Sequence, residues 1–132
     1  MKRADGNGRQ TAELRGRRSE FLASLLLMFK GYRVLGRRVR SRFGEIDLIA
    51  RSPSGVLCFI EVKARQSGET ALESVRIHQQ MRIGRAARLY VAQRPALAAK
   101  GIRFDVVAVA AGHLPRHFPG AWHPEDWGEI RR

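Results

Sequence analysis

Two apolar runs joined by a short polar segment decide the fold of this chain. Residues 43–51 read Phe-Gly-Glu-Ile-Asp-Leu-Ile-Ala-Arg, and residues 56–64 read Val-Leu-Cys-Phe-Ile-Glu-Val-Lys-Ala. Between them, residues 52–55 read Ser-Pro-Ser-Gly, a composition that is typical of turns. Short runs rich in β-branched and aromatic residues on both sides of such a turn predict two paired strands. We therefore predict that residues 43–64 form a β-hairpin.

The register of this hairpin brings acidic side chains together. A three-residue loop at positions 53–55 places Asp47 opposite Glu61 and Glu45 opposite Lys63. Directly opposed side chains have Cβ atoms about 4.5–5.5 Å apart, so two carboxylates repel there unless a proton or a cation lies between them. Mg²⁺ suits such a position because it prefers oxygen ligands and keeps several waters. The alternative interpretation is a solvated strand face with an ion pair between Glu45 and Lys63.

Helices and further strands surround the hairpin. Residues 11–30 carry apolar side chains at helical spacing, and residues 32–40 alternate as a basic edge strand would. A second helical stripe covers residues 72–90, and the valine-rich run at residues 102–110 predicts a buried strand. The order helix, three strands, helix, strand predicts an α/β fold with a mixed central sheet flanked by helices.

The length of 132 residues fits a single domain. Residues 1–10 are polar and basic without hydrophobic periodicity, so we predict a flexible arm there and the folded domain at residues 11–110. The tail at residues 111–132 contains several Gly, Pro and His residues, and its structure is not predicted. We interpret Trp122 and Trp127 as aromatic anchors that pack this tail on the domain.

The chain is strongly basic. Lys and Arg number 25 against 12 Asp and Glu, which gives a formal net charge of +13, and residues 1–42 carry about +9 of it. Such an excess favours a polyanionic partner, either nucleic acid or an anionic membrane surface. The membrane is the weaker alternative, because the apolar stripe of the first helix is needed for the core.

Cysteine content and the length of the apolar runs bear on the compartment. The only cysteine, Cys58, lies within an apolar run, so it forms no intrachain disulfide and supports no cysteine-based zinc site. The longest apolar stretch, residues 21–29, is much shorter than the about 20 residues that span a bilayer. No signal-peptide cleavage site follows it. We expect a reducing cytoplasm and no membrane association.

The hairpin also resembles a known family. Residues 43–50 and 59–65, with Lys-Gly-Tyr-Arg-Val-Leu at 30–35 and Arg-Phe-Asp-Val-Val at 103–107, are similar to the YraN-like (UPF0102) family of small bacterial proteins. The resemblance runs from about residue 19 to residue 109. That family is placed in the restriction-endonuclease-like superfamily, which is named for its PD-(D/E)xK motif and includes Holliday junction resolvases. The resemblance implies a restriction-endonuclease-like fold and a nucleic-acid substrate, DNA rather than RNA.

The superfamily pattern implies roles for individual residues. It corresponds to Asp47 and Glu61 as metal ligands, to Lys63 as the catalytic lysine, and to Glu20 on the first helix as a further acidic ligand. The implied cofactor is Mg²⁺ or Mn²⁺. At Gln79 this chain departs from relatives that carry a basic residue, and its spacing places it on the inward stripe of the second helix.

Seven arginines are candidates for contacts with phosphates, the alternative being a solvated surface: Arg37, Arg38, Arg40, Arg42, Arg82, Arg85 and Arg88. Two functional hypotheses result. The first is a Mg²⁺-dependent endonuclease that selects branched or otherwise structured nucleic acid, as a Holliday junction resolvase does. The second is a nucleic-acid-binding protein that keeps the nuclease fold without catalysis. A single site per chain needs pairing to cut both strands, so the first hypothesis also predicts a homodimer.

Overall fold

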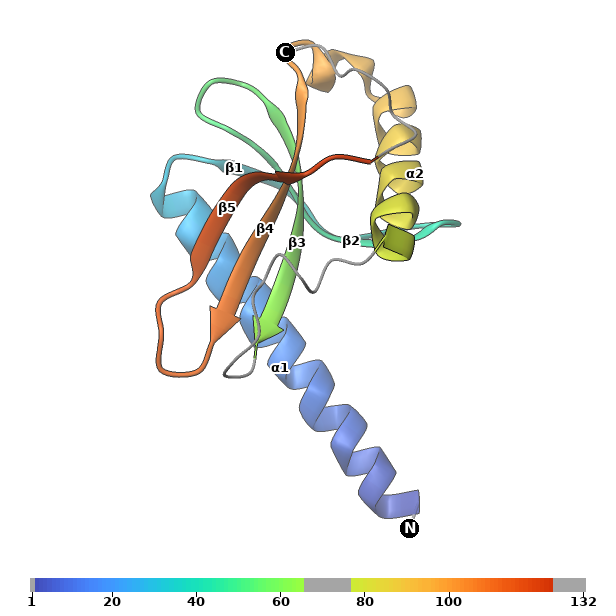
Figure 1. Ribbon diagram of the computed structural model, residues 1–132, viewed down its shortest axis with the longest axis vertical. Coiled ribbons are helices and arrows are strands. Elements are labelled where there is room, and N and C mark those ends of the chain that lie inside the picture. Colours follow the sequence, from blue (N-terminus) through green and yellow to red (C-terminus); the bar gives the residue numbers. More distant parts are fainter. Residues whose placement is uncertain (1, 66–76, 125–132) are drawn as a thin grey trace.

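Five strands form one mixed sheet with the spatial order β1-β2-β3-β4-β5, and two helices flank it (Figure 1). The computed structural model describes residues 2–65 and 77–124. In chain order the elements are α1 (Lys2–Phe29), β1 (Arg33–Ser41), β2 (Gly44–Arg51), β3 (Leu57–Arg65), α2 (Ile77–Gln93), the 3-10 helix η2 (Pro95–Ala98), β4 (Ile102–Ala110) and β5 (Arg116–Trp122). Only β3 and β4 pair in parallel. The predicted restriction-endonuclease-like class, a mixed sheet flanked by helices, is confirmed.

The hairpin of β2 and β3 has the predicted register. Ile49 pairs with Phe59, and the backbone N–H of Ser52 donates to the carbonyl of Val56 over 2.9 Å. Gly55 closes the loop at φ +94°, in the left-handed region that glycine adopts without steric cost. Loop length sets the register of a hairpin, so this turn decides which side chains of β2 and β3 meet.

Each face of the sheet carries its own hydrophobic core. On the face covered by α1 the buried residues include Ala23, Leu27, Leu48, Ile60 and Val107. On the face covered by α2 they include Ile49, Phe59, Ile83, Ala87 and Phe104. The neighbouring strands β2 and β3 contribute to both cores and are therefore held between the two helices. This places one end of the hairpin within reach of side chains from α1 and from α2.

The first helix is longer than predicted. It begins at Lys2, whereas the periodicity predicted a start near residue 11, so residues 2–10, predicted as a flexible arm, belong to the helix. Figure 1 shows that the N-terminal half of α1 extends beyond the sheet. A segment without a sheet to pack on has no need of an apolar stripe, which is why hydrophobic periodicity does not reveal it. None of the helices in the described part of the chain is long and apolar enough to cross a membrane.

The C-terminal tail contains a strand that the sequence did not predict. β5 pairs with β4 and forms one edge of the sheet, while β1 forms the other edge, as predicted. The ring of Trp122 packs with its centroid 4.7 Å from that of Phe104. Pro119 and Gly120 lie within β5, and such residues are tolerated because this is an edge strand. Trp127 and residues 72–76, the predicted start of the second helix, lie outside the described residues.

Candidate active site

The candidate site lies where the pairing of β2 and β3 ends. The last paired residues are Leu48 and Ile60. One residue further along, Oδ2 of Asp47 accepts the backbone N–H of Val62 over 2.8 Å. A side-chain oxygen thus takes the place of a backbone acceptor at the end of the ladder. This bond draws the carboxylate of Asp47 toward β3, beside the carboxyl group of Glu61 on the same strand.

Glu61 is buried, with only 8% of its surface exposed. Burial raises the pKa of its carboxyl group, and the hydrogen bond to Asp47 and the charge of Asp47 raise it further. The charge of Lys63 and the hydrogen bond from Gln79 act in the opposite direction but do not outweigh these effects. Two carboxyl groups in direct contact share a proton or a cation between them, because both cannot be ionised at low cost when buried.

Gln79 connects Glu61 and Lys63, two residues of β3. Its Nε2 donates to Oε2 of Glu61 over 2.7 Å, and its Oε1 accepts from Nζ of Lys63 over 3.0 Å. A lysine ammonium only donates, so Oε1 of Gln79 accepts from Lys63 and Nε2 is left to donate to Glu61, which fixes the orientation of the amide. The inward position predicted for Gln79 therefore makes it a neighbour of the site. Its bridging role could not be predicted, because it depends on how α2 sits on the sheet.

Glu20 reaches the same region from α1 but faces a different partner. Its Oε1 lies 2.7 Å from Nε of Arg38, and its side chain is only 14% exposed. Burial raises the pKa of Glu20, the bond to Arg38 opposes this effect, and the charges of Asp47 and Glu45 add to it. Arg38 has φ +49°, the one positive value among the described residues other than glycine. β1 thus leaves strand geometry at the residue that pairs with Glu20.

The donor set of the site fits a hard divalent cation. Within residues 2–65 and 77–124, no group of three His, Cys, Asp or Glu side chains is close enough to hold a metal ion. Asp47 and Glu61 do lie together, and Mg²⁺ is commonly held by one or two carboxylates, waters and substrate phosphates. These two residues therefore fit the implied cofactor. Glu20, predicted as a further ligand, lies nearby and is held by Arg38.

Arginines from two elements meet at the tip of the β1–β2 hairpin. The Cδ atom of Arg82 lies 2.9 Å from where a Cβ of Gly44 would be, so the side chain of Arg82 covers this turn. Arg40 is exposed and its Nε donates to Oε2 of Glu45 over 3.1 Å. The guanidinium of Arg42 stacks 5.0 Å from the ring centroid of the adjacent Phe43. We name Arg40, Arg42 and Arg82 the basic rim.

The remaining predicted phosphate contacts have other positions. Arg37, Arg85 and Arg88 are exposed. Arg37 lies beside Met28 and Tyr32, toward the C-terminal end of α1. Arg38 is engaged by Glu20. Three of the seven predicted arginines, those of the basic rim, therefore lie at the β1–β2 turn.

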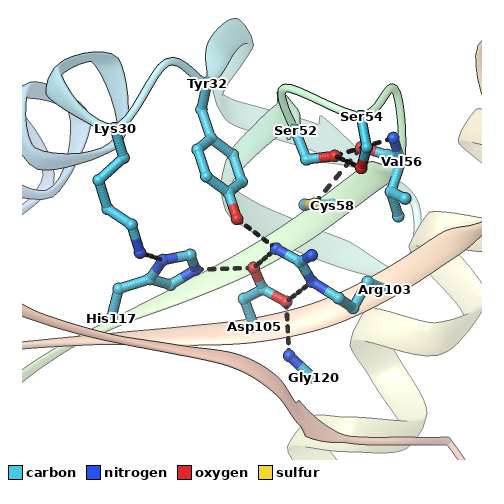
Figure 2. Close-up of polar contacts among 10 residues, drawn as sticks. All are labelled: Lys30, Tyr32, Ser52, Ser54, Val56, Cys58, Arg103, Asp105, His117 and Gly120. Carbon is cyan, nitrogen blue, oxygen red and sulfur yellow. Dashed lines mark hydrogen bonds and ion pairs between the residues drawn. The ribbon is translucent and has the colours of Figure 1, made fainter.

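A second polar cluster occupies the face of the sheet that packs on α1 (Figure 2). Asp105 is fully buried and accepts hydrogen bonds from Nε and Nη2 of Arg103, each over 2.8 Å. Nε2 of His117 and the backbone N–H of Gly120 complete its partners at 2.8 and 2.9 Å. Burial by itself raises the pKa of Asp105, but these bonds outweigh it and the pKa is lowered.

This cluster ties the tail to the domain. Nζ of Lys30 lies 2.6 Å from Nδ1 of His117, and Arg103 donates to the hydroxyl of Tyr32 over 2.6 Å. An ammonium only donates, so Nδ1 accepts and Nε2–H of His117 donates to Asp105. Arg103 and Asp105 also form an ion pair, in which Nη2 lies 2.8 Å from Oδ2. The participation of His117 required knowledge of the pairing of β4 with β5, which the sequence did not reveal.

Comparison with known proteins gives one consistent result. A family model described as "Uncharacterised protein family UPF0102" matches residues 19–109. A UPF0102 protein of Agrobacterium fabrum is 47% identical over 116 residues, covering 88% of this chain and 94% of that protein. One of Caulobacter sp. is 49% identical over 111 residues, covering 84% and 79% of the two chains. One of Maricaulis maris is 47% identical over 118 residues, covering 89% and 92%. This chain belongs to the UPF0102 family.

Proposed function

We propose that this protein is a metal-dependent endonuclease that hydrolyses phosphodiester bonds in nucleic acid. The observation that carries the proposal is the contact of the buried carboxyl group of Glu61 with the carboxyl group of Asp47, with Lys63 two residues further along β3. A binding protein gains nothing from two adjoining acids that face a polyanion, because they repel phosphate. A hydrolase needs such a pair to hold a cation that phosphate can also bind.

The residues of the site have separate roles in this reaction. Asp47 and Glu61 would hold the divalent cation, which when bound would supply Lewis-acid polarisation of the scissile phosphate. The ammonium group of Lys63 stands beside the attacked phosphate and offsets the negative charge that grows there. Gln79 keeps the amine of Lys63 and the carboxylate of Glu61 at a fixed spacing. The basic rim receives neighbouring phosphates of the backbone.

The resemblance to the PD-(D/E)xK superfamily supports the same assignment, because the motif residues of that superfamily correspond to the residues that meet here. It also favours branched DNA as the substrate. A single site per chain needs pairing to cut both strands, which favours a homodimer as the active species. Mg²⁺ and Mn²⁺ are the cofactors to test first, since both take carboxylate and water ligands.

The decisive experiment is a cleavage assay with matched variants. Branched, single-stranded and duplex DNA and an RNA are incubated with the protein in Mg²⁺, in Mn²⁺ and in chelator. We expect metal-dependent cleavage that Asp47→Asn and Lys63→Ala abolish. Glu45→Gln is the control, because Glu45 is a carboxylate on the same strand that pairs with Arg40 at the surface. Cleavage in the control and not in the other variants also excludes a contaminating nuclease.

Binding without cleavage in every metal would overturn the proposal and leave the non-catalytic alternative. In that case Asp47→Asn and Lys63→Ala bind nucleic acid as the unaltered protein does. Size-exclusion chromatography with light scattering, with and without branched DNA, tests the expected dimer separately.

A further inference from the structure

A small cavity lies between the β1–β2 hairpin and the C-terminal half of α2. Its volume is about 160 Å³. Side chains from the hairpin and from the helix line it, among them Val39, Arg40, Ile46, Leu89, Tyr90 and Arg94. Cavities that bind drug-sized molecules have volumes of about 300–1,000 Å³, so this one accommodates a single ring system rather than a whole nucleotide.

The lining of the cavity suits a flat, polar heterocycle. Val39, Ile46 and Leu89 supply apolar surface, and the ring of Tyr90 stands among them. The guanidinium of Arg94 lies over this ring, 4.2 Å from its centroid, so it covers one face of Tyr90 and offers its own outer plane for stacking. The ring of Tyr90 also packs perpendicular to the ring of Phe59, with the two centroids 5.8 Å apart, and this contact helps to hold Tyr90 in place. Aromatic rings and arginine planes are the surfaces on which proteins stack unpaired bases.

The cavity shares its helix face with the candidate active site. Gln79, Arg82, Ala86 and Tyr90 follow one another at spacings of three and four residues and so line one face of α2. Ala86, which lines the cavity, comes seven residues after Gln79, which corresponds to about 10 Å along the helix. On β2, Ile46 lines the cavity and is adjacent to Asp47. The cavity therefore lies about the length of one or two nucleotides from the carboxyl groups of Asp47 and Glu61.

Arg82 lies between the candidate active site and the cavity along α2. It lies one helical turn beyond Gln79 and one turn before Ala86, and its side chain covers the turn at Gly44. A chain of phosphates that starts at the carboxylates and leads to the cavity passes this guanidinium. Arg40 lies at the rim of the cavity itself, where it lines the wall and is 85% exposed.

We propose that this cavity binds one unstacked nucleobase of a single-stranded segment next to the phosphate at Asp47 and Glu61. The inference rests on the proposed function, which it deepens by naming the substrate class. In a duplex both faces of a base are covered by stacking, so only an unpaired or extruded base can enter. The protein therefore selects nucleic acid with an unpaired nucleotide beside the cut, as found at flaps, forks and imperfect junctions.

The test measures binding in chelator, where no cleavage occurs. Fluorescent oligothymidylate is compared with a strand of equal length in which every base is absent, so both carry the same phosphates. We expect tighter binding of oligothymidylate by about fivefold or more, the lower range for one stacked base. Comparison with an oligouridylate of equal length shows whether the protein binds single-stranded DNA or RNA more tightly.

Two variants that each lose one positive charge test whether the cavity causes the preference for the strand with bases. Arg94→Ala removes a wall of the cavity and is expected to abolish the preference for the strand with bases. Arg85→Ala removes an exposed arginine of α2 that lies outside the cavity, and is expected to keep the preference while weakening the binding of both strands alike. Thermal unfolding checks that both variants fold.

Equal binding of the two strands by the unaltered protein, or an unchanged preference in Arg94→Ala, overturns the inference. A clear preference for bases in a protein that cleaves nothing in any metal supports the cavity as a base-binding site and overturns the proposed endonuclease alone. The two failures are therefore distinguishable.

Discussion

The side-chain amide of Gln79 donates a hydrogen bond of 2.7 Å to Oε2 of Glu61, so a helix residue holds a carboxylate on a strand 18 residues earlier. Because Oε1 of the same amide accepts from Lys63, shortening the side chain breaks at least one of the two bonds. We expect Gln79→Asn to lower the cleavage rate by about 10–100-fold, the usual cost of losing a group that orients a metal ligand. The rate is measured as a function of Mg²⁺ concentration.

The expected change in Gln79→Asn includes a higher metal requirement, because Glu61 loses a donor that fixes its position. Titration calorimetry with Mn²⁺ on the unaltered protein and on the variant measures this directly. An unchanged rate at limiting Mg²⁺, in a variant that unfolds at the usual temperature, would show that Gln79 does not position the site.

The arginines of the basic rim predict how the affinity for nucleic acid depends on salt concentration. Each arginine that neutralises a phosphate releases a counterion, so its removal reduces the slope of log affinity against log salt concentration by about 1. We expect this for Arg42→Ala and for Arg82→Ala, with single-stranded DNA binding followed by fluorescence anisotropy. Arg116→Ala is the control, because it removes the same charge from β5 at the opposite edge of the sheet. A slope reduced equally by the control would contradict a localised phosphate path.

Gly44 is predicted to be intolerant of any side chain. Its φ of +123° is strained for other residues, and a Cβ there meets Cδ of Arg82 at 2.9 Å. We expect Gly44→Ala to lower the free energy of unfolding by about 1–3 kcal/mol. Gly112→Ala is a matched comparison, since Gly112 has φ +77° and no atom within 4 Å of its Cβ position. Equal losses in urea unfolding of the two variants would show that Arg82 moves aside without cost.

The lowered pKa of Asp105 predicts how the stability of the fold depends on pH. Its pKa is lowered in the folded protein relative to about 3.9 in the unfolded chain, so its stabilisation is present above pH 4. That stabilisation is lost as the pH falls below 4 toward the folded-state pKa. Asp105→Asn is expected to cost about 3 kcal/mol at pH 7, the low end for a broken buried ion pair, since Arg103 is partly exposed.

Urea unfolding of the unaltered protein and of Asp105→Asn between pH 7 and acid measures this contribution. The difference in stability between the two proteins should shrink as the pH falls. A difference that stays constant would mean that the carboxylate charge is not what holds β5 in place.

The hairpin could be predicted from sequence because its determinants are local. The composition of residues 52–55 fixes the loop, the loop fixes the register, and alternation then brings Asp47 toward Glu61. Strict alternation is interrupted in β2, however, because both Ile46 and Ile49 belong to the core beneath α2. Asp47 lies between them and bonds to the backbone of Val62 instead of continuing the ladder.

Contacts between distant elements could not be predicted in the same way. The bond between Arg38 and Glu20 joins β1 to α1 and depends on a left-handed backbone at an arginine, which no propensity favours. Arg38 was expected to bind phosphate because its charge was visible in the sequence and its partner was not. The pairing of His117 with Asp105 likewise follows from β5, whose Pro119 and Gly120 conceal a strand.

The parallel pairing of β3 with β4 has a kinetic consequence. Parallel neighbours need a long crossover, and here that crossover contains α2 with Gln79 and the wall of the cavity. Nothing in the local sequence holds Glu61, Lys63 and Gln79 together until this loop has closed, and closing it is entropically slow. The site is therefore expected to form late during folding, because β3 pairs with β4 only after the crossover that contains α2 has closed.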